Sequence, residues 1–216
     1  MNGFELTTVP KEFKLKEATM VIQEPRAIEM IENRIYFYSE INRTEILQLN
    51  KSILQMRNAH ITEKQVRELP DDTVTPIYLH LSSYGGDIFA GVAGMDEILK
   101  TVKSVPVYTI IDGCCSSAAT FLSVVGTRRF INSNAYMLIH QLSSGFWGKY
   151  SEFEDEQKNL HRFMEMMKGV YGKYANIPES ELDNILKHDL WFDAQKCLEY
   201  GLVDEIIGDT VDAGNE

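Results

Sequence analysis

The fold is decided by residues 77–102, IYLHLSSYGGDIFAGVAGMDEILKTV, in which a strand leads into a helix through a glycine pair. Apolar residues first alternate with Tyr78 and His80, the period of a strand with one buried face: Ile77, Leu79 and Leu81. Gly85 and Gly86 then break the strand and permit a turn or a close approach of backbone to a ligand. Apolar residues at helical spacing follow: Ile88, Val92, Met95, Leu99 and Val102. This stretch therefore predicts a strand–turn–helix unit.

The same succession occurs on both sides of this unit. Residues 35–38 are a β-prone run that leads into a helical stripe of apolar residues: Ile46, Leu49, Ile53 and Met56. Residues 105–111 predict a buried strand. Residues 113–117, GCCSS, predict a tight turn into an apolar helix that continues to about Val125. Repeated strand–helix alternation is typical of the α/β class.

The C-terminal part continues this alternation. Residues 130–131 and 136–139 predict a strand pair around a turn. A long helix follows, with apolar residues on one face: Phe153, Leu160, Phe163, Met167, Val170 and Tyr174. Pro178 opens a short helix, and residues 194–200 form the last helix, with Gly201 as its left-handed cap. No linker divides the chain, so we expect one domain.

Three segments fit this domain poorly. Residues 1–32 are weakly periodic and are expected to form an N-terminal arm or loop with one strand at most. The main domain then covers residues 33–207, with a polar insertion or helix extension at residues 57–75. Residues 208–216 are expected to be a flexible tail.

Composition excludes several classes of function. The 216 residues carry a formal net charge of -11, which argues against a nucleic-acid partner because phosphate binding requires a basic surface. The first residues lack the pattern of a secretion signal, and no apolar run is long enough to span a membrane. The three cysteines, an odd number, form no disulfide framework. We expect a soluble, cytoplasmic protein with free thiols.

Candidate nucleophiles cluster in residues 114–117, CCSS, at a strand-to-helix turn. A side chain there is exposed, and the nearby backbone N–H groups can point toward an anion. Serine is also a favoured helix N-cap, so Ser116 or Ser117 could have a purely structural role. Spacing alone does not choose among the four side chains.

His140 is the best candidate for a base among the five histidines. It lies at the end of an apolar strand and opens a loop that begins with Gln141 and Leu142, the usual place for a functional side chain on a rigid scaffold. The others fall in the polar insertion, on a charged helix, on the less apolar strand face or at a helix end: His60, His161, His80 and His188. A structural role for His140 is an equally common alternative.

Motifs for phosphate or zinc binding are absent from the sequence. No G-x-x-x-x-G-K-[ST] pattern occurs, and no two histidines stand four residues apart around a glutamate. We therefore expect neither a metal nor an organic cofactor.

Taken together, four segments resemble the motifs of the Clp protease proteolytic subunits, the ClpP family. They are Leu81 to Gly86, which resembles a strand followed by N-S-P-G-G; Gly113 to Phe121, the nucleophile turn; Leu138 to Gln141, which resembles M-I-H-Q; and Asp189 to Asp204, which ends in EYGLVD. The resemblance covers roughly residues 33–207 and implies a crotonase-like spiral of ββα units.

The resemblance also implies a set of roles. Ser117 rather than Ser116 would be the nucleophile, His140 the base and Asp189 the acid that orients it, with Asp193 the competing candidate and more simply a helix N-cap. Backbone N–H groups of Gly86 and Ala118 would stabilise the oxyanion. An extended substrate would add as a strand at four positions: Gly85, Gly86, Gln141 and Leu142.

By the same resemblance the chain is expected to be a serine endopeptidase that cleaves extended or unfolded polypeptides through an acyl-enzyme. It would assemble into a homo-oligomeric ring, stacked heptamers by analogy, and work with an AAA+ unfoldase. Tyr84 in place of proline, and Ala118 and Ala119 in place of Met-Gly, depart from the family pattern. The alternatives are a crotonase-like acyl-CoA enzyme on the same fold, or a catalytically inactive ring subunit.

Overall fold

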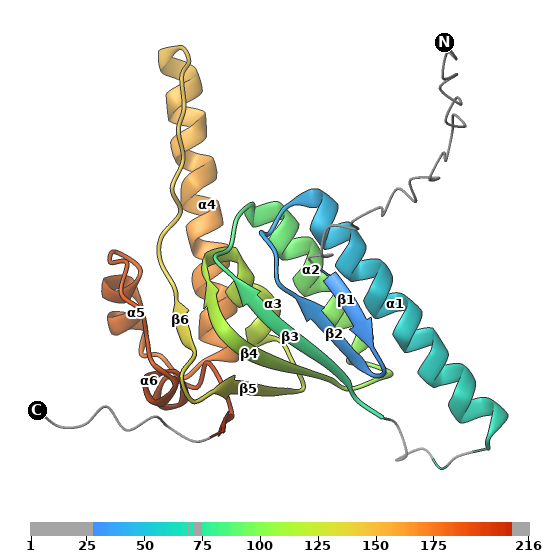
Figure 1. Ribbon diagram of the computed structural model, residues 1–216. Helices are drawn as coiled ribbons and strands as arrows, with labels where there is room; N and C mark the ends of the chain where they lie inside the picture. Colours follow the sequence, from blue (N-terminus) through green and yellow to red (C-terminus); the bar gives the residue numbers. More distant parts are fainter. Residues whose placement is uncertain (1–27, 69, 71–74, 209–216) are drawn as a thin grey trace, which may run out of the picture.

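The computed structural model describes residues 28–68, 70 and 75–208, which form one α/β domain (Figure 1). Outside these residues lie 1–27 of the expected arm, 69 and 71–74 of the polar insertion, and 209–216 of the expected tail. The elements, in chain order, are β1 (Ile28–Ile31), β2 (Arg34–Phe37), α1 (Arg43–Val66), β3 (Ile77–Ser83), α2 (Ile88–Thr101), β4 (Val107–Ser116), a 3₁₀ turn (Ser117–Ala119), α3 (Thr120–Val124), β5 (Arg128–Asn132), β6 (Tyr136–Leu138), α4 (Tyr150–Tyr174), α5 (Glu179–Ile185), α6 (Ala194–Glu199) and β7 (Glu205–Ile207).

The strands form a single sheet in the order β1-β2-β3-β4-β5-β7, with β6 paired to β4 outside this path. Every pair is parallel except β1 with β2. The expected pairing of residues 130–131 with 136–139 is wrong. β4 is ten residues long, so its first half pairs with β5 while residues 114–116 pair with β6.

Two further expectations change at the edges of elements. Cys114 to Ser116 continue β4 instead of forming a turn, because β6 supplies them with strand partners. The turn itself is confined to Ser117, at φ 54°. Residues 28–31, expected in an arm with one strand at most, form β1, which joins the sheet as its edge strand; only Ile28 in it is buried, so the residues carry little periodic signal.

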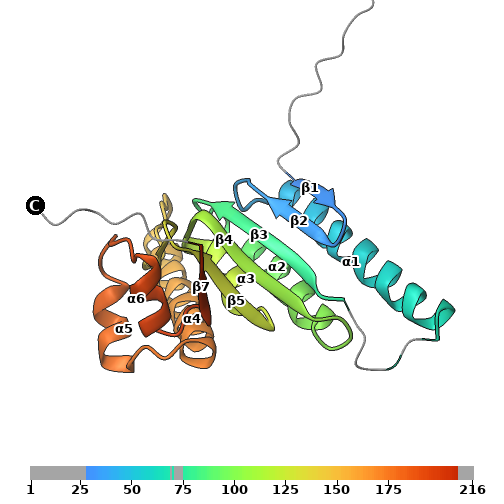
Figure 2. The ribbon, with the colours of Figure 1, turned by 60° about the horizontal axis from the view of Figure 1, so that its bottom comes forward.

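Helices α1, α2 and α3 cover one face of the sheet (Figures 1 and 2). The fully buried strand side chains point toward them, among them Ile35, Phe37, Leu79 and Leu81. α1 begins where the Asn42 side chain accepts a hydrogen bond from the Glu45 N–H, at 3.0 Å. It continues without a break to Val66, so residues 57–66 of the polar insertion extend a helix whose first half has one buried face.

Helix α4 is the expected long helix, but it buries few of its apolar side chains. Only Met167, Val170 and Tyr171 are buried in it, near its C-terminal end. Figure 1 shows its first half projecting from the sheet beside the segment that follows β6. Phe153, which lies on the apolar face predicted for this helix, packs edge-on against Phe146 at the far end of this projection. In the part of the chain that is described, no helix has the length and apolar character to cross a membrane.

The sheet face opposite the helices carries a polar cluster centred on Asp112. Its carboxylate accepts hydrogen bonds from His80 Nδ1 at 2.8 Å and Asn132 Nδ2 at 2.9 Å, and from the Tyr38 hydroxyl. Burial raises the pKa of Asp112, but the hydrogen bonds from His80 and Tyr38 outweigh it, so the pKa lies below its usual value. The folded state therefore favours the charged carboxylate.

Because the pKa of Asp112 is lower in the folded than in the unfolded chain, its stabilisation is present above the unfolded value of about 4 and is lost as the pH falls through the folded value. We expect Asp112→Asn to cost about 2 kcal/mol of stability at pH 5. The difference in unfolding free energy between the variant and the native protein should shrink toward pH 3, as followed by thermal unfolding. Asp155→Asn, at an exposed position on α4, is the control. A difference that is constant from pH 5 to pH 3 would contradict this account.

Candidate functional site

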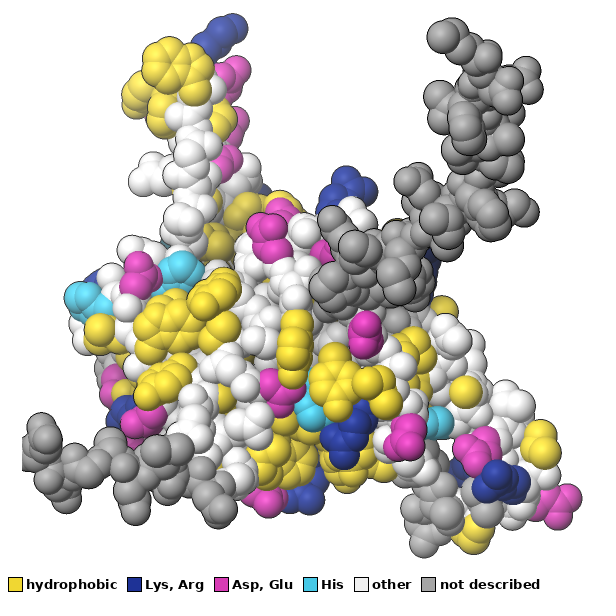
Figure 3. All heavy atoms as spheres, in the orientation of Figure 1, with side chains coloured by type: hydrophobic (Ala, Val, Ile, Leu, Met, Phe, Trp, Pro, Cys, Tyr) yellow, Lys and Arg dark blue, Asp and Glu magenta, His cyan; other side chains and the backbone are white. Residues whose placement is uncertain are grey.

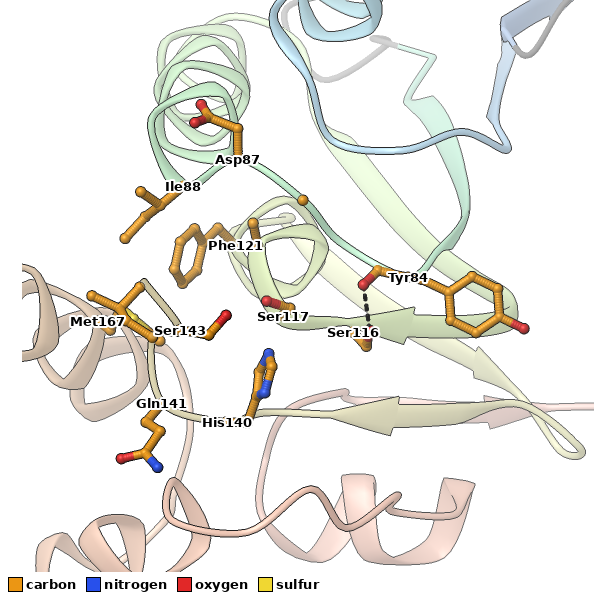
Figure 4. Close-up of a pocket in the computed structure, with 13 residues that line it drawn as sticks. Tyr84, Asp87, Ile88, Ser116, Ser117, Phe121, His140, Gln141, Ser143 and Met167 are labelled. Atoms are coloured by element: carbon orange, nitrogen blue, oxygen red, sulfur yellow. Dashed lines mark hydrogen bonds between the residues drawn. The ribbon is translucent and has the colours of Figure 1, made fainter. Parts of the chain in front are cut away.

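A cavity of about 410 Å³ lies where β4 and β6 end (Figure 4). Its walls come from the segment after β3, the turn after β4 and the loop after β6. Ile88, Phe121 and Met167 line one side of it and make that side apolar. Ile88 and Met167 were predicted only as apolar positions on helices, since helical spacing does not distinguish a core position from the wall of a cavity.

The structure separates the four candidate nucleophiles. Cys115 is fully buried, and burial raises the pKa of its thiol to about 12, so it remains protonated. The Ser116 hydroxyl donates a hydrogen bond to the Tyr84 carbonyl at 2.7 Å, and the residue is almost completely buried. Ser117 lines the cavity, whereas Cys114 does not. Of the four, Ser117 alone presents a side chain to the cavity that is not engaged elsewhere in the described structure.

Ser117 lies on a strained turn. Its φ of 54° belongs to the left-handed region, which non-glycine residues rarely adopt. It ends β4 and begins the short 3₁₀ turn that leads to α3. This abrupt change of direction turns its side chain toward His140, as Figure 4 shows.

His140 and Asp189 form a hydrogen-bonded pair, with 2.8 Å between Nδ1 and Oδ1. Two sets of backbone hydrogen bonds hold them together. Phe192 and Met137 bond each other at 2.7 and 2.9 Å, and the Gln141 N–H donates to the Leu186 carbonyl at 2.7 Å. With Nδ1 donating to the carboxylate, Nε2 is left as the acceptor facing the cavity.

Ser117 and His140 face each other across the cavity but are not hydrogen-bonded to each other in the described structure. Contacts of this kind are often loose without substrate and tighten when it binds.

A second histidine–aspartate pair shows why position matters. His80 also directs Nδ1 to a carboxylate, that of Asp112, but its Nε2 lies 2.9 Å from Arg34 Nη1. Its ring stacks on Tyr36 on the sheet face away from the cavity. Both nitrogens of His80 are thus engaged, so it has no free acceptor for a nucleophile.

Gly85 and Gly86 have φ values of 93° and 146°, which residues with a side chain rarely adopt. A Cβ on Gly85 would lie 2.7 Å from the Ser117 Cβ and 2.6 Å from the Ser116 carbonyl. One on Gly86 would lie 2.3 Å from the Ile41 carbonyl. The glycine pair therefore allows the segment after β3 to pack directly against the Ser117 turn.

Gly86 and Ala118 both line the cavity, as the expected oxyanion position requires. The Gly86 N–H donates to no other group among the residues described. Ala118 stands at the start of a helical turn, where N–H groups lack partners within the helix. Two donors are thus available beside Ser117.

The expected substrate-strand residues are only partly together. Gly86, Gln141 and Leu142 line the cavity, but Gly85 does not. The N–H groups of Gln141 and Leu142 are engaged by the Leu186 carbonyl and the Met164 sulfur. In the described structure no N–H donates to the carbonyl oxygens of Gln141 and Leu142, which remain open to an added strand.

Parallel strands with helices packed on one face, and a cavity at the strand ends, define a crotonase-like α/β fold of the ClpP type in a single domain. The chain belongs to the Clp protease family, whose sequence model matches residues 29–210. Its activity is therefore proteolysis.

Three curated proteins illustrate the similarity. The chain is 34% identical to ATP-dependent Clp protease proteolytic subunit 2 of Treponema denticola over 155 residues, 69% of this chain and 76% of the relative. It is 31% identical to proteolytic subunit 1 of Leifsonia xyli over 78% of this chain and 86% of the relative. It is 31% identical to the proteolytic subunit of Oryza sativa over 80% of each.

The two neighbouring aspartates should respond differently to mutation. The Asp193 side chain accepts a hydrogen bond from the Lys196 N–H at 2.7 Å and caps α6, while Asp189 bonds only His140 in the described structure. We expect Asp193→Ala to lose about 1 kcal/mol of stability and to keep most peptidase activity. Asp189→Asn should unfold like the native protein and lose activity by orders of magnitude. Urea unfolding and peptide hydrolysis check this, and the reverse pattern would assign the orienting role to Asp193.

Proposed function

We propose that the chain is a serine-type endopeptidase that cleaves extended polypeptides through an acyl-enzyme. One observation carries the proposal: Ser117 on its left-handed turn faces, across one cavity, a His140 ring whose Nδ1 is held by Asp189. A nucleophile, a base and a group that orients the base are the parts that acyl transfer requires. No metal or organic cofactor enters the scheme.

Each step follows from this arrangement. Ser117 Oγ attacks the peptide carbonyl carbon while His140 Nε2 takes its proton, and the N–H groups of Gly86 and Ala118 stabilise the oxyanion. His140 then gives the proton to the leaving amine, and the acyl–Oγ ester forms. Water repeats the sequence and releases the acid. Asp189 keeps the Nδ1–H tautomer throughout, because its carboxylate accepts that hydrogen.

A serine-directed fluorophosphonate tests the nucleophile. The native protein should be labelled on Ser117 and inhibited. Ser117→Ala should lose the label and several orders of magnitude of activity with its fold intact. Ser116→Ala is the matched control. It should lose at most the hydrogen bond to the Tyr84 carbonyl, about 1 kcal/mol, and keep most of its activity.

The opposite result for the two serine variants would move the nucleophile by one residue. A native protein that is neither labelled nor able to cleave peptides would instead favour an inactive ring subunit or an acyl-CoA enzyme.

The proposal extends to assembly as a homo-oligomeric ring, stacked heptamers by analogy with the family, that receives substrate from an AAA+ unfoldase. The relatives are named proteolytic subunits of an ATP-dependent protease. Apolar side chains gather at the tip of the projection that carries α4, as Figure 3 shows, where a subunit contact would bury them. They are Phe146, Trp147, Tyr150 and Phe153.

A substrate that adds as a strand must first have its backbone free of its own structure. We expect the isolated protein to cleave short or unfolded peptides slowly and to leave a stable folded protein intact, as followed by gel electrophoresis. The same substrate protein, unfolded chemically before it is added, is the matched control. Sedimentation should show an oligomer. Efficient degradation of the folded protein without partner or ATP would mean an open site and contradict the proposal.

A further inference from the structure

Two exposed aromatic side chains meet beside the cavity. The rings of Tyr84 and Trp191 pack edge to face, with centroids 6.3 Å apart and an interplanar angle of 89°. Tyr84 is 79% exposed and Trp191 42% exposed. Neither ring is needed to fill the core, and large apolar groups displayed together on a surface often mark a binding site.

The backbone of both residues is attached to the elements that carry the catalytic side chains. The Tyr84 carbonyl accepts the hydrogen bond of Ser116, the residue directly before Ser117. Trp191 lies between Asp189, which holds His140, and Phe192, which is bonded to Met137 of β6 through both its N–H and its carbonyl. The backbone that carries the two rings therefore has a fixed position relative to Ser117 and His140.

The pair lies on the side of the nucleophile away from the apolar wall. In Figure 4 the Tyr84 ring points away from Ser117 in the direction opposite to Ile88, Phe121 and Met167. Tyr84 also borders a second cavity, of about 630 Å³, which leaves room for a chain to continue. In the substrate, the residues before and after the scissile bond lie on opposite sides of the carbonyl carbon that Ser117 attacks. If the side chain before the bond lies against the apolar wall of the cavity, the residue after the bond lies on the side of Tyr84.

We propose that Tyr84 and Trp191 form the subsite for the residue that follows the scissile bond, and that they favour an aromatic or large aliphatic side chain there. This inference rests on the proposed function of Ser117 and makes its substrate class more specific. The leaving amine must lie next to His140, which protonates it, and Asp189 and Trp191 belong to the same short segment. A flat apolar side chain can contact both rings, whereas glycine contacts neither.

Acyl transfer measures this subsite directly. The native protein is given an N-acetylated dipeptide methyl ester ending in leucine, together with phenylalanine amide or glycine amide. Ser117 displaces methanol and forms the acyl-enzyme. The added amine then attacks the ester carbonyl, its proton passes to His140, and the acyl–Oγ bond breaks as the C–N bond forms and Ser117 recovers its proton. Water competes for the same acyl-enzyme, so the ratio of peptide to acid reports occupancy on the leaving side.

We expect phenylalanine amide to give roughly tenfold more transfer than glycine amide, the effect of one buried aromatic contact. Trp191→Ala should bring this preference close to one while ester hydrolysis continues, and Tyr84→Ala provides a second, independent variant. Trp147→Ala removes the other tryptophan, at the tip of the projection, and should keep the tenfold preference. The ratio does not depend on the fraction of active protein, so an effect on assembly cannot imitate the result.

Three outcomes would overturn the inference. Equal transfer to the two amides by a native protein that still hydrolyses the ester would contradict the subsite but not the proposed peptidase activity. A Trp191→Ala protein with altered sedimentation and an unchanged preference would make the pair a subunit contact. A native protein that turns over neither ester nor peptide would overturn the subsite and the proposed function together.

Discussion

The close approach of Gly85 to the Ser117 turn is the contact on which the site depends. At the end of β3 the missing side chain lets the backbone pass where a Cβ would come within 2.7 Å of the Ser117 side chain. The Ile41 N–H donates to the Gly85 carbonyl, and the Ile41 carbonyl accepts from the Asp87 N–H, so the segment before α1 locks the same loop from its other side. Three distant parts of the chain thus converge on one serine. Its left-handed backbone, a costly conformation for a residue with a side chain, is held within this set of contacts.

The two histidine–aspartate pairs illustrate how a fold gives one chemical unit two uses. Each pair joins Nδ1 to a carboxylate at 2.8 Å. On the open sheet face, Arg34, Tyr36 and Tyr38 complete the hydrogen bonding and stacking around His80 and Asp112, and the result is a stabilising cluster. At the end of β6 no group occupies the Nε2 side of His140 in the described structure, and that side faces Ser117. Reactivity follows from the unoccupied nitrogen rather than from the pair.

The covering of the sheet is one-sided, and this explains the distribution of apolar surface. Helices α1 to α3 bury one face, and only the C-terminal end of α4 reaches the core. Tyr150 and Phe153 of α4 are exposed on a projection, and Tyr84 and Trp191 lie at the rim of the cavity. Exposed apolar surface often marks binding, and these are the two places where the subunit contact and the substrate subsite are proposed.

Periodicity in the sequence was sufficient for the α/β class, for the strand–turn–helix unit of residues 77–102 and for the α6 cap at Gly201, because these depend on neighbouring residues. The motif resemblance also singled out Ser117, His140 and Asp189, which the structure brings to one cavity or into a hydrogen-bonded pair. Only the tertiary structure decided that β6 pairs with β4 and that Ser116 bonds the Tyr84 carbonyl. It also decided that the Gln141 N–H is already engaged and that Tyr84 meets Trp191. Each of these contacts joins residues far apart in the chain, and the local spacing of residues does not determine which distant group they will contact.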